Sequence, residues 1–144
     1  MPPSFASLRA LSLAISASKP TLSGYKKLYE STGWAPSASV SDEVLQAAID
    51  NSWYWISAYD DQTLIGIGRL VSDGALYAFV CDMIVDPKYQ KQGIGTSILE
   101  MLKEKCKKHS FRRVWLFAAP GRAGFYLSNG FEIRPDNAPG MQLK

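Results

Sequence analysis

The spacing of apolar and polar residues predicts one strand and two helices in the first third of the chain. Residues 11–16 alternate between apolar and small polar side chains, as a half-buried strand does. Residues 22–32 place their apolar side chains at helical spacing, and Gly33 supplies a natural end. A second helix is expected within residues 39–52, because Ser41 is a good N-cap and acidic residues follow it.

The middle of the chain reads as three strands followed by a long helix. Residues 53–87 are rich in apolar and aromatic side chains, with turn signals at Asp60-Asp61 and at Asp73-Gly74. The helix is expected from about Gly93 to His109. Its buried stripe is formed by apolar side chains four residues apart, namely Ile94, Ile98, Leu102 and Cys106.

The last third predicts a strand in residues 112–118 and a short helix in residues 120–130. Residues 131–135 and 140–144 are candidate final strands. The order β-α-α-β-β-β-α-β-α-β, with one further strand left open, indicates an α/β (α+β) fold in which helices pack on a mixed sheet. We assign residues 1–144 to a single domain, and we consider disorder for residues 1–6.

Composition and charge exclude some functions. The 144 residues are 47% hydrophobic and 20% charged, with a net charge of +3 and a pI near 8.9, which is too weakly basic to indicate nucleic-acid binding. Lysine and arginine crowd residues 103–113, either as a solvated helix face or as a patch that attracts an anionic ligand. No apolar run approaches the roughly 18 residues of a membrane span, so no membrane partner is expected.

The rare residues add little chemistry. Cys81 and Cys106 stand in apolar surroundings without a second ligand at metal spacing, so we interpret them as free thiols in a reducing compartment. His109 is the single histidine, which argues against a histidine metal site, and no metal is expected. We predict a cytoplasmic protein, although the serine-rich, acid-free start leaves organellar targeting open.

The stretch VDPKYQKQGIGTSILEML, residues 85–102, carries the clearest functional pattern. A strand runs into Asp86-Pro87, the chain turns, and a helix begins at Gly93-Ile94-Gly95. A helix start has backbone N–H groups without partners and a partial positive charge, and glycine lets a ligand approach them. Such a place binds phosphate, with the Thr96 hydroxyl and nearby lysines in support. A tight, packed turn is the alternative.

Two familiar phosphate motifs do not fit this stretch. The dinucleotide fingerprint requires a third glycine where Ile98 stands, and no Gly-Lys-Ser/Thr follows as a P-loop requires. Instead, Gln90-x-x-Gly93-x-Gly95 after a strand ending Val85-Asp86-Pro87 resembles the acyl-CoA signature of the GNAT superfamily of N-acetyltransferases.

A second segment strengthens the resemblance. Residues 125–131, Phe-Tyr-Leu-Ser-Asn-Gly-Phe, are similar to the Phe-Tyr-x-x-x-Gly-Phe segment of that superfamily, one helix and one strand further on. The resemblance implies a mixed sheet of six to seven strands, splayed at the fourth, with about four helices. Many members carry asparagine and alanine where this chain has Ala119 and Arg122, which puts one pantetheine contact in doubt. Arg122 supplies charge there or is simply solvated.

The resemblance also implies an activity. We expect an acetyl-CoA-dependent N-acetyltransferase that transfers an acetyl group to a primary amine of a small molecule, by direct attack in a ternary complex. A protein or peptide amine as acceptor, and a non-catalytic acyl-CoA-binding sensor, are the alternatives. A homodimer is considered as well. Acetyl-CoA is the co-substrate, and the identity of the amine is left open.

Residue roles follow from the matched positions. The strand backbone is expected to bond the pantetheine arm, with a β-bulge near Asp82 and a free amide at Met83 or Ile84 for the thioester oxygen. The helix start is expected to hold the diphosphate. The expected coenzyme-binding residues are Met83, Ile84, Val85, Gln90, Lys91, Gln92, Gly93, Ile94, Gly95, Thr96 and Tyr126.

Two side chains are candidates for proton transfer. Tyr126 is the candidate general acid for the leaving thiolate, or a ring that only packs on the coenzyme. Asp82 is the candidate base or amine anchor, because a carboxylate in an apolar strand is costly unless it is paired or used; a structural aspartate is the alternative. The acceptor is expected to contact Asp82 together with Tyr25, Tyr29 and Trp34, although core packing also explains aromatic residues.

Overall fold

The structure is a computed structural model that describes residues 11–34 and 40–144, so the segment 1–6 lies outside the described residues. Its centre is a five-stranded sheet in the order β1-β2-β3-β4-β5, antiparallel except for the parallel pair β4 and β5. The strands are β1 (Leu13–Ser16), β2 (Tyr54–Asp60), β3 (Thr63–Ser72), β4 (Tyr77–Val85) and β5 (Arg113–Leu116). The α/β class and the expected element order are confirmed as far as the last helix.

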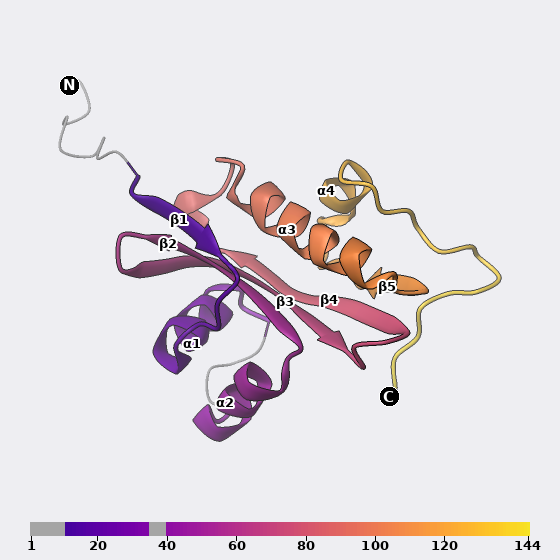
Figure 1. Cartoon of the computed structure of the whole chain (residues 1–144), viewed down its shortest axis with the longest axis horizontal. Helices are drawn as coiled ribbons and strands as arrows, with labels where there is room; N and C mark the ends of the chain where they lie inside the picture. The colour runs from indigo at the N-terminus through magenta and orange to yellow at the C-terminus, as the bar shows by residue number, and fades with distance from the viewer. Residues whose placement is uncertain (1–10, 35–39) are drawn as a thin grey trace.

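Helices cover both faces of the sheet (Figure 1). The helices α1 (Leu22–Ser31) and α2 (Asp42–Asn51) lie on one face. The opposite face carries α3 (Ile94–His109) and the short α4 (Ala123–Leu127), and a 3₁₀ turn, η3 (Pro87–Tyr89), links β4 to α3. Each face buries its own hydrophobic core, which makes a three-layer arrangement.

The local sequence explains where the helices begin. Ser41 caps α2 as expected, because its side chain accepts from the Val44 amide, and Thr21 caps α1 through the Gly24 amide. In α3 the predicted stripe is buried against the sheet, from Ile94 to Cys106. Burial of that stripe, rather than a side-chain cap, stabilises α3, since Gly93 at its start makes no side-chain capping bond.

The expected β-bulge lies in β4. Ile67 pairs with Ile84 and Arg69 pairs with Cys81, so Asp82 and Met83 of β4 lie opposite the single residue Gly68 of β3. The extra residue puts Asp82 into the left-handed backbone region, with φ of 49°. Glycine at 68 is required because an added Cβ would lie 2.7 Å from the Met83 sulfur and 2.8 Å from Leu102 of α3. A side chain at position 68 would therefore clash both with the bulge and with the middle of α3.

The sheet opens on the other side of the same strand. β5 pairs with β4 from Tyr77 to Val80 and then ends at Leu116. Beyond that point the edge of β4 away from β3 has no neighbouring strand in the part of the chain that the structure describes. This is the splay expected at the fourth strand, and it leaves room for a ligand beside Cys81 to Val85.

Residues 11–34 and 40–144 contain five sheet strands rather than the six to seven expected. Residues 131–135 and 140–144 form no strand, and Ile133, Met141 and Leu143 are exposed. A short apolar run predicts a strand only if a partner edge completes its ladder, and these segments find none within the described residues. None of the helices in residues 11–34 and 40–144 is both long and apolar enough to cross a membrane.

Candidate active site

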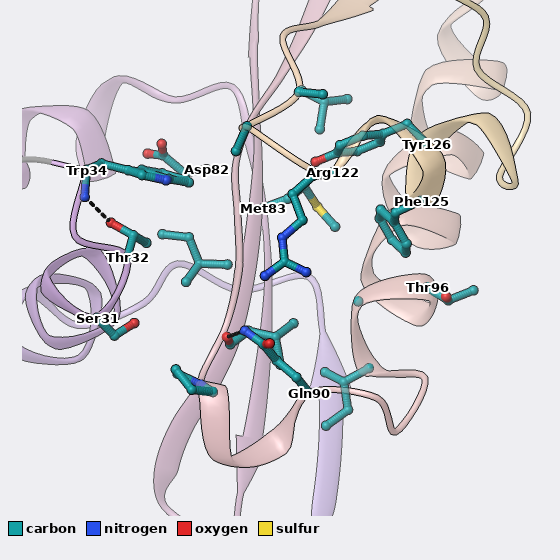
Figure 2. Close-up of a pocket in the computed structure, with 18 of the residues that line it drawn as sticks. Ser31, Thr32, Trp34, Asp82, Met83, Gln90, Thr96, Arg122, Phe125 and Tyr126 are labelled. Atoms are coloured by element: carbon teal, nitrogen blue, oxygen red, sulfur yellow. Dashed lines mark hydrogen bonds between the residues drawn. The ribbon is translucent and has the colours of Figure 1, made fainter.

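A cleft of about 960 Å³ opens where β4 and β5 separate. Figure 2 shows that its wall comes from β4, from the start of α3 and from the loop and helix α4, and that the end of α1 closes the opposite side. Its size is that of a small-molecule site. The lining residues that the sequence predicted are Trp34, Asp82, Met83, Ile84, Val85, Gln90, Lys91, Gly93, Ile94, Gly95, Thr96 and Tyr126.

The turn at one end of the cleft is held by three anchors. The Asp86 amide donates to the Ile65 carbonyl, and the Asp86 side chain accepts from the Lys88 amide at 2.9 Å. The Tyr89 hydroxyl donates to Asp60 at 2.8 Å, which ties the turn to the β2–β3 hairpin. The backbone before α3 is therefore positioned by the sheet itself.

The start of α3 offers free donors to the cleft. Gly93 has φ of 82° and no atom within 4 Å of the place where a Cβ would lie, so the backbone is open to a ligand there. The first turn contains no acidic residue and no side-chain cap, so its amides and the helix dipole favour an anion. Thr96 is an exposed lining residue, whereas Gln92 is not among the lining residues.

The edge of β4 presents further backbone donors. The Asp86 amide bonds to the Ile65 carbonyl of β3, and Ile84 pairs with Ile67. Because backbone groups alternate in direction along a strand, the backbone N–H and C=O of Ile84 point toward β3, and those of Val85 and Met83 point toward the cleft. The Gln90 side chain donates to the Val85 carbonyl at 3.0 Å, which covers the end of this edge. Of the two amides considered for the thioester oxygen, Met83 is therefore the one on the cleft side.

Tyr126 projects from α4 across the cleft. In Figure 2 its ring extends toward β4, and its hydroxyl lies on the side of the Met83 side chain. The ring packs edge-on against Phe125 and Phe131, with centroids 5.1 and 5.9 Å away. Burial raises the pKa of Tyr126 above that of a free phenol, and nearby Arg122 partly opposes the rise. The phenol therefore keeps its proton throughout the neutral range.

Asp82 is held from beneath by two side chains. Its Oδ2 atom accepts from the Tyr25 hydroxyl at 2.5 Å and from Arg69 Nε at 2.9 Å. Arg69 also donates to Ser52 Oγ at 3.0 Å, at the end of α2. Burial and the Asp82 carboxylate together raise the pKa of Tyr25, so this hydroxyl donates rather than accepts. Asp82 thus lines the cleft, and its Oδ1 atom has no hydrogen-bond partner among the residues that the structure describes.

The aromatic residues divide between the cleft and the core. Trp34 lines the cleft on the side of Asp82, and its amide donates to Thr32 Oγ1 (Figure 2). Tyr29 packs edge-on against Trp34 at 6.0 Å, behind it. Tyr25 is buried and reaches the cleft only through its bond to Asp82. Trp53 does not line the cleft and packs against α3, beside Lys105 and Phe111.

Sequence reasoning missed Arg69, Ser31 and Thr32. Arg69 stands in the apolar run of β3, and a charge there signals a partner on the neighbouring strand, which is Asp82. Ser31 and Thr32 line the cleft at the end of α1 and bond back to the helix carbonyls of Leu28 and Tyr29. Periodicity gave no signal for them. No cluster of three or more metal-binding side chains occurs in the described ranges.

Comparison with known proteins is consistent with this geometry. A family model described as the acetyltransferase (GNAT) family matches residues 24–131. The chain is 31% identical over 120 residues to the uncharacterized N-acetyltransferase ycf52 of Gracilaria tenuistipitata var. liui, which covers 81% of this chain and 64% of that protein. It is 33% identical over 125 residues to the histone acetyltransferase TAP1 of Glycine max, covering 79% of this chain and 53% of TAP1. The chain therefore spans less than two thirds of these relatives.

Solved structures agree at the level of the fold. A probable acetyltransferase of unknown function from methicillin-resistant Staphylococcus aureus superposes with a TM-score of 0.82 at 27% sequence identity. The match covers 92% of this chain and 98% of that one. The similarity thus extends over most of both chains.

Proposed function

The chain belongs to the acetyltransferase (GNAT) family, and from that premise we propose that it transfers the acetyl group of acetyl-CoA to a primary amine of a small molecule. One observation carries the proposal: Tyr126 and Asp82 line a single cleft whose end is the open backbone at Gly93. A donor for a leaving thiolate, an acceptor for an amine and a phosphate-binding helix start thus share one space.

The coenzyme is proposed to lie along the edge of β4. Its diphosphate binds the amides at the start of α3, where no side chain intervenes. Its pantetheine arm adds to the free edge as a strand would, through the backbone of Val85 and Met83. This path leads the thioester to the bulge, beneath the Tyr126 hydroxyl.

The reaction proposed at the bulge is direct attack in a ternary complex. The amine nitrogen forms a bond to the thioester carbon, and the Met83 amide donates to the oxygen that becomes negative, a contact that contributes about 3 kcal/mol in comparable sites. As the carbon–sulfur bond breaks, the thiolate takes the proton of Tyr126. Asp82 binds the acceptor ammonium through Oδ1 and takes its first proton, which leaves a neutral amine to attack. The second proton, which the nitrogen loses after the bond has formed, passes through solvent to Tyr126 and replaces the one given to the thiolate.

The acceptor is proposed to enter from the end of α1. Asp82 supplies the negative charge and Trp34 an apolar ring beside it, a combination that suits an amine attached to an aromatic or apolar body. Tyr29 supports the Trp34 ring, and Tyr25 acts through Asp82. These residues would then discriminate among amines.

A protein amine is the second candidate acceptor. It is favoured by the similarity to a relative whose name is histone acetyltransferase. The cleft of this chain shows one acidic lining residue in the described ranges, Asp82, so only one cationic group of an acceptor finds an opposite charge there. A lysine-rich peptide has little negative charge to bind here, which is why we place the small amine first.

A screen of amines tests the proposal. The full chain is incubated with acetyl-CoA and, in parallel, arylalkylamines, polyamines, lysine-rich peptides and peptide N-termini, while release of the free thiol is followed. We expect turnover with small primary amines that is absent in the Tyr126→Phe, Asp82→Asn double variant. Turnover with peptides alone would transfer the proposal to a protein acceptor, and tight binding of acetyl-CoA without turnover of any amine would contradict an enzyme.

A further inference from the structure

Arg122 is a charged residue of the cleft that the proposed reaction leaves without a role. It lines the cleft, and within the described residues its guanidinium forms no hydrogen bond or ion pair. Asp82, the acidic lining residue, is on the far side of β4 and is already paired with Arg69. The guanidinium therefore faces the coenzyme side of the cleft with its full charge available.

A defined turn fixes the direction of Arg122. The Arg122 amide donates to the Ala119 carbonyl at 3.0 Å across Pro120 and Gly121, and Gly121 has φ of 78°. Proline second and a left-handed glycine third are the marks of a type II turn, which sets Arg122 at its last position. The Arg122 carbonyl then accepts from Phe125, so the same residue begins α4.

The side chain extends into the cleft from the side opposite the sheet. Figure 2 shows Arg122 leaving the loop before α4 with its guanidinium directed toward the end of the cleft where Gln90 lies. That end is also where Gly93 opens the first turn of α3. Two groups that carry full or partial positive charge therefore face the same end of the cleft. The backbone amides of α3 lie on one wall, and the Arg122 guanidinium lies on the other.

We propose that Arg122 binds a phosphate group of the coenzyme, so that the phosphates are held between Arg122 and the start of α3. The inference rests on the proposed function, because it assigns a contact to the same coenzyme. A guanidinium suits phosphate because it is planar, permanently charged and able to donate two parallel hydrogen bonds to phosphate oxygens. Because Arg122 begins α4, the contact also holds against the coenzyme the helix that carries Tyr126.

Two phosphate sources within the coenzyme fit the same chemistry, namely the diphosphate and the 3′-phosphate of the ribose. Dephospho-CoA lacks the second, and acetyl-pantetheine lacks both. The alternative anion for Arg122 is a carboxylate on the acyl group, and malonyl-CoA, which carries one, tests for that contact. Comparing these three ligands with acetyl-CoA therefore separates the possible partners of one side chain.

Isothermal titration of the full chain measures the contact. We expect Arg122→Ala to weaken acetyl-CoA binding by about tenfold or more, as loss of a charged hydrogen bond does, while acetyl-pantetheine affinity stays the same. Arg122→Lys should recover part of the loss. If the loss persists with dephospho-CoA the partner is the diphosphate, and if it disappears the partner is the 3′-phosphate; either result supports the proposal.

Arg113→Ala is the matched control, since Arg113 is exposed and pairs with Tyr77 at the far end of β5. It should leave every affinity unchanged, and thermal melting checks that each variant is folded. The proposal is overturned if Arg122→Ala binds acetyl-CoA as the wild type does, if acetyl-pantetheine weakens equally, or if the loss appears only with malonyl-CoA. The first result would leave the proposed function standing, whereas a wild-type chain that binds no acetyl-CoA would end both.

Discussion

Arg69 and Asp82 form an ion pair between neighbouring strands, with Arg69 Nε 2.9 Å from Asp82 Oδ2. Asp82 is the residue that the bulge forces into the left-handed backbone region. The pair therefore holds in place the point where β4 changes register and where the Met83 amide turns toward the cleft. Because Arg69 also bonds to Ser52, the same contact links the bulge to the end of α2.

Removing one member of this pair should destabilise the fold. The two side chains are 18% and 14% exposed, so Arg69→Ala leaves a poorly solvated carboxylate, and we expect a loss of about 3 kcal/mol in the free energy of unfolding. Urea denaturation measures it. Lys26→Ala breaks an exposed pair with Asp42 at 2.8 Å and should have little effect. Removing both Arg69 and Asp82 should lower the free energy of unfolding by clearly less than the sum of the two single changes; strictly additive losses would contradict a coupled pair.

Asp82→Asn tests the proposed contact with the acceptor. The amide keeps the shape of the side chain but loses the charge, so we expect kcat/KM for the amine to fall by about a hundredfold while the Kd for acetyl-CoA is unchanged. Steady-state kinetics and titration of the coenzyme separate the two effects. Unchanged amine turnover in a folded variant would return Asp82 to a structural role.

Tyr126→Phe tests the proposed general acid. The variant should lose about a hundredfold in kcat with little change in the Kd for acetyl-CoA, since only the hydroxyl is removed. An acid works only while protonated, and the raised pKa of Tyr126 keeps the proton in place above the ordinary phenol value of about 10. The wild-type kcat should therefore show no alkaline fall until the pH has passed the ordinary phenol value of about 10. An alkaline fall that begins well below that pH, or a fully active variant, would argue against the assignment.

Trp34→Ala tests the acceptor side of the cleft. Removing a ring that stands beside Asp82 should raise KM for aromatic amines several-fold and leave coenzyme affinity as it was. Trp53→Phe serves as the control, because Trp53 packs against Phe111 on the other face of the sheet. A KM that does not respond to Trp34→Ala would place the acceptor elsewhere.

Much of the fold could be predicted because local patterns agreed with it. The stripe from Ile94 to Cys106 defined α3, and Asp73-Gly74 marked the turn between β3 and β4. The bulge was expected from the resemblance and is present at Asp82. The glycines at 93 and 95 indicated an open helix start, and the structure gives the space that this needs.

The rest depends on contacts between residues far apart in the sequence. Helical spacing placed Tyr25 on the buried stripe of α1, but its bond to Asp82, 57 residues away, required the packing of α1 against the sheet. The segment 131–135 around Ile133 was predicted to be a strand because it is partly apolar. A strand also needs the edge of a neighbouring strand to pair with, and no local sequence pattern reports whether one is present. The direction of Arg122 likewise comes from the turn at Gly121 and not from its own position in the sequence.

The central claim is that the start of α3 binds the coenzyme diphosphate, and titration of acetyl-CoA into Gly93 variants tests it most directly. Gly93→Glu adds a carboxylate where the diphosphate is proposed to lie, while Gly93→Ala imposes the same backbone strain without bulk or charge, since nothing lies within 4 Å of the added Cβ. We predict binding by the wild type and by Gly93→Ala and none by Gly93→Glu. Equal affinity of the folded Gly93→Glu variant would contradict the account.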